Sequence, residues 1–377
     1  MPSPVVHHVY LLPGFFGFVH FGKLVYFSHV REFLEGRLSE LGLPAEIHFI
    51  RVSPTASLRA RATEVVDYVR ATAPTDGGPI HFIGHSTGGL DARLVTTPGA
   101  SLDGREVEPY AQRVRSVVTV ATPHLGTPLA SFFATLLGQK ILRLLSLGTI
   151  TVLRQGRWPL SILMRIGAAF ARIGAPDSRT TALLDHLADD LLDRIPRGER
   201  DRVTDFVRAV SFDQALIPQL APETMDVVNT SAQDRAGVRY GCVVARARPP
   251  RVTGYLAAGI SPGAQAMYAL YAWLHRQVAA SRSRIRPNLT EAQRTAIATG
   301  LGALPTPADS DGIVPTLSQV WGDVIHAARG DHLDVIGHFD DPRHVPPHRD
   351  WITTQSGFDR AQFEALWTAV AAYVVAS

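Results

Sequence analysis

Apolar segments rich in β-branched residues alternate with amphipathic segments along the first third of the chain. The strand-like segments cover residues 5–12, 46–52, 80–83 and 114–120. The helix-like segments cover residues 30–41, 57–70 and the stretch through Leu90 and Leu94. Alternation of this kind predicts an α/β fold, in which helices flank both faces of a mostly parallel sheet.

The alternation stops in the middle of the chain. Residues 109–176 contain no acidic side chain, and apolar clusters lie between the arginines of this stretch. An amphipathic helix is expected over residues 181–195, and the strand pattern returns at 238–245 and 323–328 before a closing helix at 358–375. These patterns predict one core interrupted by two helical insertions.

The expected division of the chain follows from these breaks. It consists of a core at 1–126, a helical lid or cap at 127–235, a core strand at 236–248, a second helical insertion at 249–304 and a core at 305–377. The basic, leucine-rich stretch at 129–172 has two interpretations. It is either a lid that opens its apolar face at a lipid interface or a cap packed permanently over the sheet.

The composition argues against several classes of protein. A net charge of +3 without a basic run argues against nucleic-acid binding. Cys242 is the only cysteine, so an intramolecular disulfide is excluded, and its strand context predicts a packed core residue. Residues 252–274 lack charge, but their glycines and proline favour a loop and a helix over a membrane span. The N-terminus shows no secretory signal pattern, which indicates a cytoplasmic protein as given and leaves secretion of a processed form open.

The sequence Gly84-His85-Ser86-Thr87-Gly88 joins a buried strand to a helix. This G-x-S-x-G pattern is typical of a tight turn that lifts a serine hydroxyl clear of the sheet as a nucleophile. The alternative is a serine in an ordinary strand–helix turn. The preceding glycine-rich turn, which includes Gly14, ends the first strand. The N–H groups of Phe15 and Thr87 could therefore converge on one oxygen as an oxyanion hole.

A serine hydroxyl needs a base, and the base needs an acid to orient it. In this arrangement the chain order is serine, acid, histidine. His332 lies just after the strand at 323–328, where a loop would overhang the carboxyl edge of the sheet. Asp311 is the favoured acid, and Asp309 is its close rival.

The chain contains 15 histidines, so position decides which of them can act. His81 and His85 lie in or beside the strand that leads to Ser86 and are not placed to face its hydroxyl. A Pro- and Asp-rich stretch that is expected to form a surface loop holds His338, His344 and His348. Asp331 and Asp334 lie too close in sequence to His332 to orient its ring and are expected to support its loop.

Taken together, PGFFG, IGHSTGGLDAR, ATPHLGTPLA, LAPETMDVVN, SDGIVP and DHLDVIG resemble segments of the α/β-hydrolase lipases, particularly the bacterial triacylglycerol lipases. The resemblance implies a Ser86–Asp311–His332 triad, oxyanion amides from Phe15 and Thr87, and no cofactor. It further implies that a hydrophobic ester, such as an acylglycerol, is hydrolysed through an acyl-enzyme.

The chain departs from that family at two places. Pro13 stands where the family has a histidine that supports the oxyanion turn. The family's structural calcium uses an aspartate just after the catalytic histidine, which Asp334 matches. The second calcium aspartate would lie upstream of the acid loop, where residues 285–298 offer only Glu291, so the sequence makes no firm prediction of a metal.

Other functions are compatible with the same motifs. An acyltransferase, a thioesterase or a polyester hydrolase would use the same three side chains. A non-catalytic binding protein with this fold is a more distant alternative, because it would be expected to lack at least one of the three.

Overall fold

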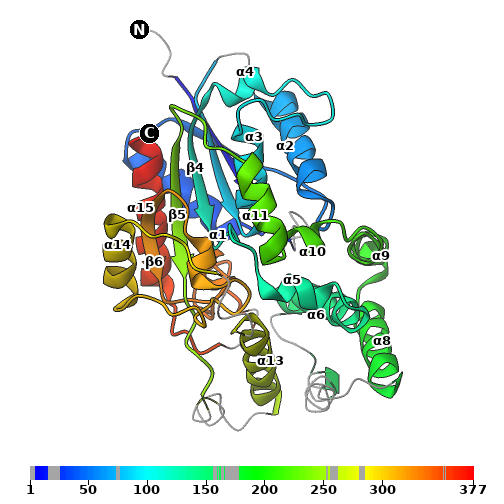
Figure 1. The fold of residues 1–377 in the computed structure, drawn as a ribbon. Helices are drawn as coiled ribbons and strands as arrows, with labels where there is room; N and C mark the ends of the chain where they lie inside the picture. The colour runs from blue at the N-terminus through cyan, green and yellow to red at the C-terminus, as the bar shows by residue number, and fades with distance from the viewer. Residues whose placement is uncertain are drawn as a thin grey trace.

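A six-stranded sheet forms the centre of the computed structural model, which describes residues 5–15, 26–73, 77–155, 159, 161–162, 165, 178–251, 254, 262–279, 285–350, 352 and 354–377 (Figure 1). The strands are β1 (His7–Leu12), β2 (Ala45–Phe49), β3 (Ile80–His85), β4 (Val114–Val120), β5 (Arg239–Ala245) and β6 (Asp323–Ala328). All neighbours pair in parallel, in the order β2-β1-β3-β4-β5-β6. The predicted α/β class with a parallel sheet is therefore confirmed.

Successive residues of a strand point to opposite faces, and each face is covered by its own helices. The helices next to the sheet are α1 (Ser28–Glu40) and α15 (Arg360–Val375) on one face and α2 (Leu58–Thr72), α3 (Thr87–Thr96) and α14 (Glu291–Leu301) on the other. On β1, Val9 and Leu11 pack toward α1, whereas Tyr10 and Leu12 pack toward α2. Cys242 lies fully buried beside α14, as predicted for a core residue, and burial raises its pKa to about 12.

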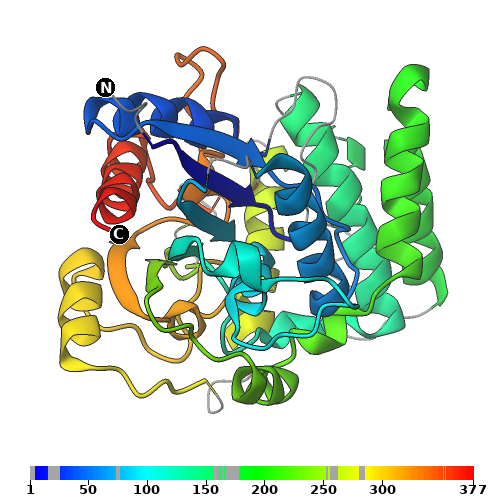
Figure 2. The ribbon, with the colours of Figure 1, turned by 90° about the horizontal axis from the view of Figure 1, so that it is seen from above.

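The remaining helices lie mainly at one end of the sheet (Figures 1 and 2). The short α4 (Glu108–Ala111) precedes β4, and α13 (Pro262–Ala279) precedes α14. The chain between β4 and β5 forms α5 (Pro128–Phe133), α6 (Leu136–Gln155), α8 (Ser178–Asp193), α9 (Arg197–Phe212), α10 (Leu216–Gln219) and α11 (Pro222–Ser231). The exact limits of the two insertions stay a prediction.

The acid-free stretch obtains its counter-charges from a later helix. Its cations pair with carboxylates of α8, in the pairs Lys140–Asp185, Arg143–Asp189 (3.1 Å) and Arg165–Asp190 (2.5 Å). Exposed pairs of this kind contribute little stability each. They explain why basic side chains of α6 lie opposite carboxylates of α8 where the two helices face each other. Within the described part of the chain, no helix is both long and apolar enough to cross a membrane.

A buried ion pair fixes α2 against α3. Arg61 and Asp91 are both completely buried, with Nη2 of the arginine 2.6 Å from Oδ2 of the aspartate. Arg61 also donates to the carbonyl oxygens of Ser53 (2.8 Å) and Pro13 (3.0 Å). Burial raises the pKa of Asp91, and the Arg61 charge opposes that shift. One guanidinium thus ties together α2, the helix that begins after Ser86, and the turn after β1.

Removing one partner of this pair should destabilise the fold more than removing both. Arg61→Met leaves a buried carboxylate without its counter-ion, so the free energy of unfolding should fall by about 3–5 kcal/mol. Arg61→Met/Asp91→Leu leaves no buried charge and should regain a measurable part of that loss. Urea unfolding followed by circular dichroism measures both variants. Equal stability of the single and double variants would contradict this account of the pair.

Candidate active site

Ser86 has a backbone conformation that residues other than glycine rarely adopt, with φ 54° and ψ −127°. It lies between the last residue of β3 and the first residue of α3. Its N–H donates to the carbonyl of Val120 (2.8 Å), and its own carbonyl accepts from Gly89 (3.1 Å). Such strained turns persist only where the surrounding structure holds them, and they cluster at functional sites. The predicted sharp turn between strand and helix is therefore present.

Two glycines allow the backbone to crowd around this turn. A Cβ atom at Gly88 would lie 2.3 Å from the carbonyl oxygen of Leu12, so α3 begins directly against the end of β1. A Cβ atom at Gly14 would lie 2.6 Å from Cβ of Ser86. The turn that follows β1 is thus in close contact with the Ser86 side chain, and a larger residue at either position would displace it.

The imidazole of His332 is held by Asp311. Nδ1 of His332 lies 2.7 Å from Oδ2 of Asp311, and the carboxyl group is almost fully buried. Three further groups donate to this carboxylate: the N–H groups of Ile313 (2.9 Å) and Val314 (2.7 Å) and the amide of Gln319 (3.1 Å). A carboxylate beside Nδ1 fixes the proton on that nitrogen, so Nε2 carries the lone pair. His332 is therefore arranged to accept a proton at Nε2.

The sequence-based alternatives for the acid lie elsewhere. The carboxylate of Asp309 accepts from the backbone N–H (2.7 Å) and the hydroxyl (2.9 Å) of Thr306. Asp331 accepts from the N–H groups of Leu333 and Asp334, both at 2.9 Å, inside the histidine loop. Of the four carboxylates considered, the one at position 311 contacts the His332 ring.

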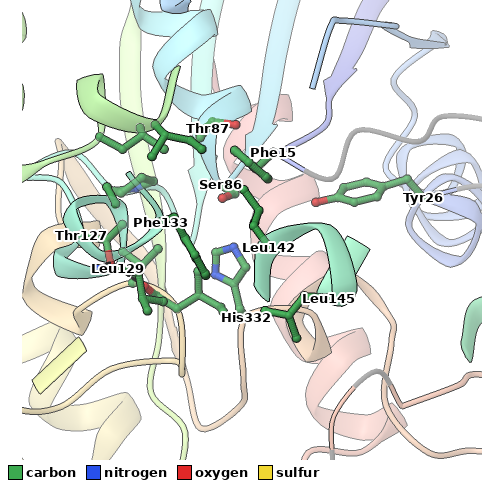
Figure 3. Close-up of a pocket in the computed structure, with 16 residues that line it drawn as sticks. Phe15, Tyr26, Ser86, Thr87, Thr127, Leu129, Phe133, Leu142, Leu145 and His332 are labelled. Carbon is green, nitrogen blue, oxygen red and sulfur yellow. Dashed lines mark hydrogen bonds between the residues drawn. The ribbon is translucent and has the colours of Figure 1, made fainter. Parts of the chain in front are cut away.

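Ser86 and His332 line the same cavity (Figure 3). The cavity is lined mostly by apolar side chains and is partly open to solvent. Phe15 and Thr87, the two expected oxyanion residues, line it as well. Its apolar walls come from α5, α6, α10 and nearby loops and include Leu129, Ala130, Phe133, Leu142, Leu145, Ile217, Leu220, Ile313 and Val314.

Tyr26 and His85 connect the oxyanion turn to the histidine loop, a link that the sequence did not reveal. The hydroxyl of Tyr26 accepts from the Gly14 backbone and lies 2.6 Å from Nδ1 of His85. Nε2 of His85 lies 2.8 Å from the carbonyl oxygen of His332. Burial holds the pKa of His85 well below its ordinary value, so the neutral ring donates from Nε2 and accepts from Tyr26 at Nδ1.

Two contacts from other parts of the chain hold the turn at Pro13 and Gly14. Nη2 of Arg61 donates to the carbonyl of Pro13, and Tyr26 bonds the backbone of Gly14. The turn that carries Phe15 is thus held by two side chains from other parts of the chain. No sequence motif predicts either contact, because both depend on tertiary packing.

The partners of Asp334 differ from those expected. Asp331, Asp334 and Asp350 place one carboxylate oxygen each within 4.8 Å of one another, whereas Glu291 lies exposed at the start of α14. Burial raises the pKa of Asp331 to about 7 and, with mutual repulsion, that of the other two well above the ordinary value. Crowded buried carboxylates fit a hard, oxygen-liganded cation such as Ca²⁺.

The expectation of a surface loop for the later histidines is wrong for two of them. His338 and His348 are buried, whereas His344 is half-buried. The ring of His348 stacks on Phe339 with centroids 4.2 Å apart. A polar, Pro-rich composition suggested exposure, but aromatic stacking pulls this loop onto the core.

Comparisons with known proteins agree with this architecture. Residues 59–157, which include Ser86, match the family described as "Putative serine esterase (DUF676)". A search of curated proteins by sequence finds no match.

Several solved lipases and esterases share the fold. The lipase of Staphylococcus hyicus is 16% identical with a TM-score of 0.52, covering 100% of this chain and 96% of that one. EstA of Clostridium botulinum is 16% identical with a TM-score of 0.52, and the match covers 98% of this chain and 87% of that one. Lipase 1 of Pelosinus fermentans is 16% identical with a TM-score of 0.50, and the match covers 98% of each chain. The family match and these neighbours support a hydrolase, and the chain has the α/β-hydrolase fold of bacterial lipases and esterases.

Proposed function

We propose that this protein is a serine carboxylester hydrolase that acts on hydrophobic esters. The observation that carries the proposal is the cavity lined by both Ser86 and His332, with Asp311 bonded to the far side of the imidazole. A hydroxyl on a strained turn, a base and an orienting acid are the three parts that serine-based acyl transfer needs.

The reaction follows from the protonation states of these groups. Ser86 Oγ attacks the ester carbonyl while Nε2 of His332 takes its proton, and the resulting imidazolium is stabilised by the Asp311 carboxylate. The tetrahedral intermediate then collapses as His332 returns the proton to the leaving alcohol, which leaves an acyl group on Ser86. Water, deprotonated by the same imidazole, attacks the acyl-enzyme. The second tetrahedral intermediate collapses as His332 returns the proton to Ser86 Oγ, and the acid is released.

The oxyanion is assigned to the amides of Phe15 and Thr87. Thr87 is the first residue of α3, and the first N–H groups of a helix have no acceptor within the helix. Such groups, at the positive end of the helix dipole, stabilise developing negative charge. Phe15 follows Gly14, which lies against Ser86, so its backbone is close to the attacking oxygen.

Substitution of the three proposed catalytic residues should abolish turnover of p-nitrophenyl butyrate. Ser86→Ala and His332→Ala should each lower kcat by a factor on the order of 10⁴ to 10⁶. Asp311→Asn should lower kcat by a factor on the order of 10⁴, because the imidazole loses the carboxylate that fixes its proton.

Asp309→Asn is the matched control for the acid. It changes a neighbouring aspartate whose carboxylate accepts hydrogen bonds from Thr306, so kcat should stay close to that of the wild type. Turnover that survives in Ser86→Ala would remove the nucleophile from the proposal. Equal losses in the two aspartate variants would instead point to a general disturbance of the loop.

The apolar walls predict a preference that depends on the acyl chain. Leu145 on α6 lines the cavity, and Leu145→Trp would fill part of it. The value of kcat/KM should fall roughly tenfold or more for long-chain p-nitrophenyl esters and change little for the acetate. Leu145→Ala, which enlarges the same wall, is the opposite control and should retain long esters. A uniform loss across all chain lengths in Leu145→Trp would count against an acyl site here.

We further propose that Asp331, Asp334 and Asp350 hold a structural calcium ion. Its support is that these three residues place one carboxylate oxygen each within 4.8 Å of the others, and a divalent cation would relieve the repulsion that raises their pKa values. Thr354 and Ser356 donate to two of these carboxylates (3.0 and 2.7 Å) and orient them. The ion takes no part in the chemical steps and would stabilise the loop that carries the catalytic base.

Calcium removal should make the stability of the protein fall as the pH rises. The folded chain binds more protons than the unfolded chain, because the pKa of Asp331 is raised to about 7. The stability from this protonation is complete below the unfolded pKa of about 3.9 and is lost as the pH rises through the folded value. In a chelator, Tm should therefore fall between pH about 5 and about 8.

Calcium should reverse that trend. At a hundred times its dissociation constant, calcium should add about 2.7 kcal/mol of stability near neutral pH. Asp350→Asn should abolish the calcium-dependent rise in Tm. Asp340→Asn, which changes an exposed aspartate of the same loop, is the control and should retain that rise. A Tm that is independent of calcium at every pH would refute the site.

A further inference from the structure

A second polar cluster lies outside the cavity that holds Ser86. It consists of His29 on α1 and of His344 and His348, which follow the catalytic histidine in the chain. One ring nitrogen from each lies within 4.8 Å of the other two. We propose that these three imidazoles form a site for Zn²⁺ or a similar divalent transition metal.

The hydrogen bonds of two of the rings fix which nitrogen carries the lone pair. Nδ1 of His348 donates to the carbonyl of Gly337 (2.6 Å), and Nδ1 of His344 donates to that of Pro346 (2.8 Å). In both rings, therefore, Nε2 carries the lone pair. Histidines that bind metals characteristically donate their other N–H to a backbone carbonyl in this way, which fixes the tautomer.

The third ring completes the pattern. His29 hydrogen-bonds the backbone of Pro347, and proline has no N–H, so the imidazole is the donor. Its Nδ1 is buried and has no hydrogen-bond partner among the residues that the structure describes, so Nε2 makes that bond. A buried acceptor without a partner is costly in a native structure and calls for an explanation. A metal ion at the centre of the cluster would satisfy it.

The charge state of the rings suits a metal. Burial and the neighbouring imidazoles lower the pKa of His29 to about 3, and burial lowers that of His348. Neutral imidazoles are the form that binds metals, and nitrogen ligands favour zinc and its neighbours over calcium. In a tetrahedral zinc site the ligand nitrogens are about 3.4 Å apart, so binding would draw these atoms together by at most about 1.4 Å. It would also turn the rings of His29 and His348 out of their present stacked arrangement, in which the centroids are 3.7 Å apart.

The cluster is open to solvent through its own cavity. His29, His344 and His348 border a hollow that is open to solvent and is flanked by charged residues of α1 and α15, among them Glu32 and Arg360. An ion can therefore approach the rings from solvent, and water from the hollow can fill the fourth position. Figure 2 shows the end of α1 that carries this site beside the loop after the histidine.

A zinc ion here would fasten that loop to α1. The same loop contains His338, whose Nε2 lies 3.2 Å from the carbonyl of Tyr26, and ends at Asp350 of the carboxylate cluster. The ion would thus stabilise the chain that follows the proposed base without touching the substrate. This proposal does not depend on the esterase activity.

The test is calorimetric titration of ZnCl₂ into the full chain after removal of metals, with calcium present throughout so that the carboxylate cluster is occupied. The wild type should bind one equivalent of zinc tightly and show a higher Tm with it. His344→Asn and His348→Asn should each weaken that equivalent at least tenfold.

His48→Asn is the matched control. His8, Glu46 and His48 form a second group with metal-like spacing, but His8 and His48 already hydrogen-bond each other at 3.2 Å. This variant should keep the tight equivalent. His344 is half-buried, so His344→Asn should have the same Tm as the wild type in the absence of zinc. An unchanged Tm would show that weaker zinc binding in this variant comes from the lost imidazole and not from a loss of folding. Zinc binding that is equally tight in His344→Asn, or that disappears in His48→Asn, would overturn the assignment.

Discussion

The left-handed backbone at Ser86 is the constraint on which the rest of the site depends. A residue other than glycine in such a conformation costs about 1–3 kcal/mol, which the surrounding contacts must offset. The sheet supplies one contact through Val120, and the buried pair Arg61–Asp91 locks the helix that starts at the next residue. The serine therefore lies between a strand and a helix that are both held by buried contacts, while the groups that would act on it come from loops.

Those loops are positioned by polar contacts across long sequence distances. Tyr26 bonds the turn after β1 and His85, and His85 bonds the backbone of His332. The oxyanion turn, the nucleophile turn and the histidine loop are thus joined by one hydrogen-bonded chain behind the cavity. A substitution of Tyr26 would therefore change the positions of two of the groups proposed for catalysis, although Tyr26 itself carries out no chemical step.

The sequence predicted the parts of the fold that depend on local patterns. The strands β4 and β6 begin and end where their apolar runs do, and the turn at Ser86 follows from five consecutive residues. It did not predict Tyr26 or Asp350, because each acts through residues far away in the chain. Periodicity reports which face of an element is buried, but it does not report which loops meet at the end of a sheet.

The two proposed metal sites share a physical cause. The chain between β6 and α15 packs apolar side chains such as Ile336 and Phe339 into the core, and it also fixes the His332 imidazole. Among these residues it buries the carboxylates of Asp331 and Asp334 and the imidazoles of His338 and His348, and it half-buries Asp350. Buried polar groups stabilise a fold only when their charges and lone pairs are satisfied. A cation that prefers oxygen ligands would satisfy the carboxylate cluster, and one that prefers nitrogen ligands would satisfy the imidazole cluster. The rigidity of this loop would then depend on which ions are bound.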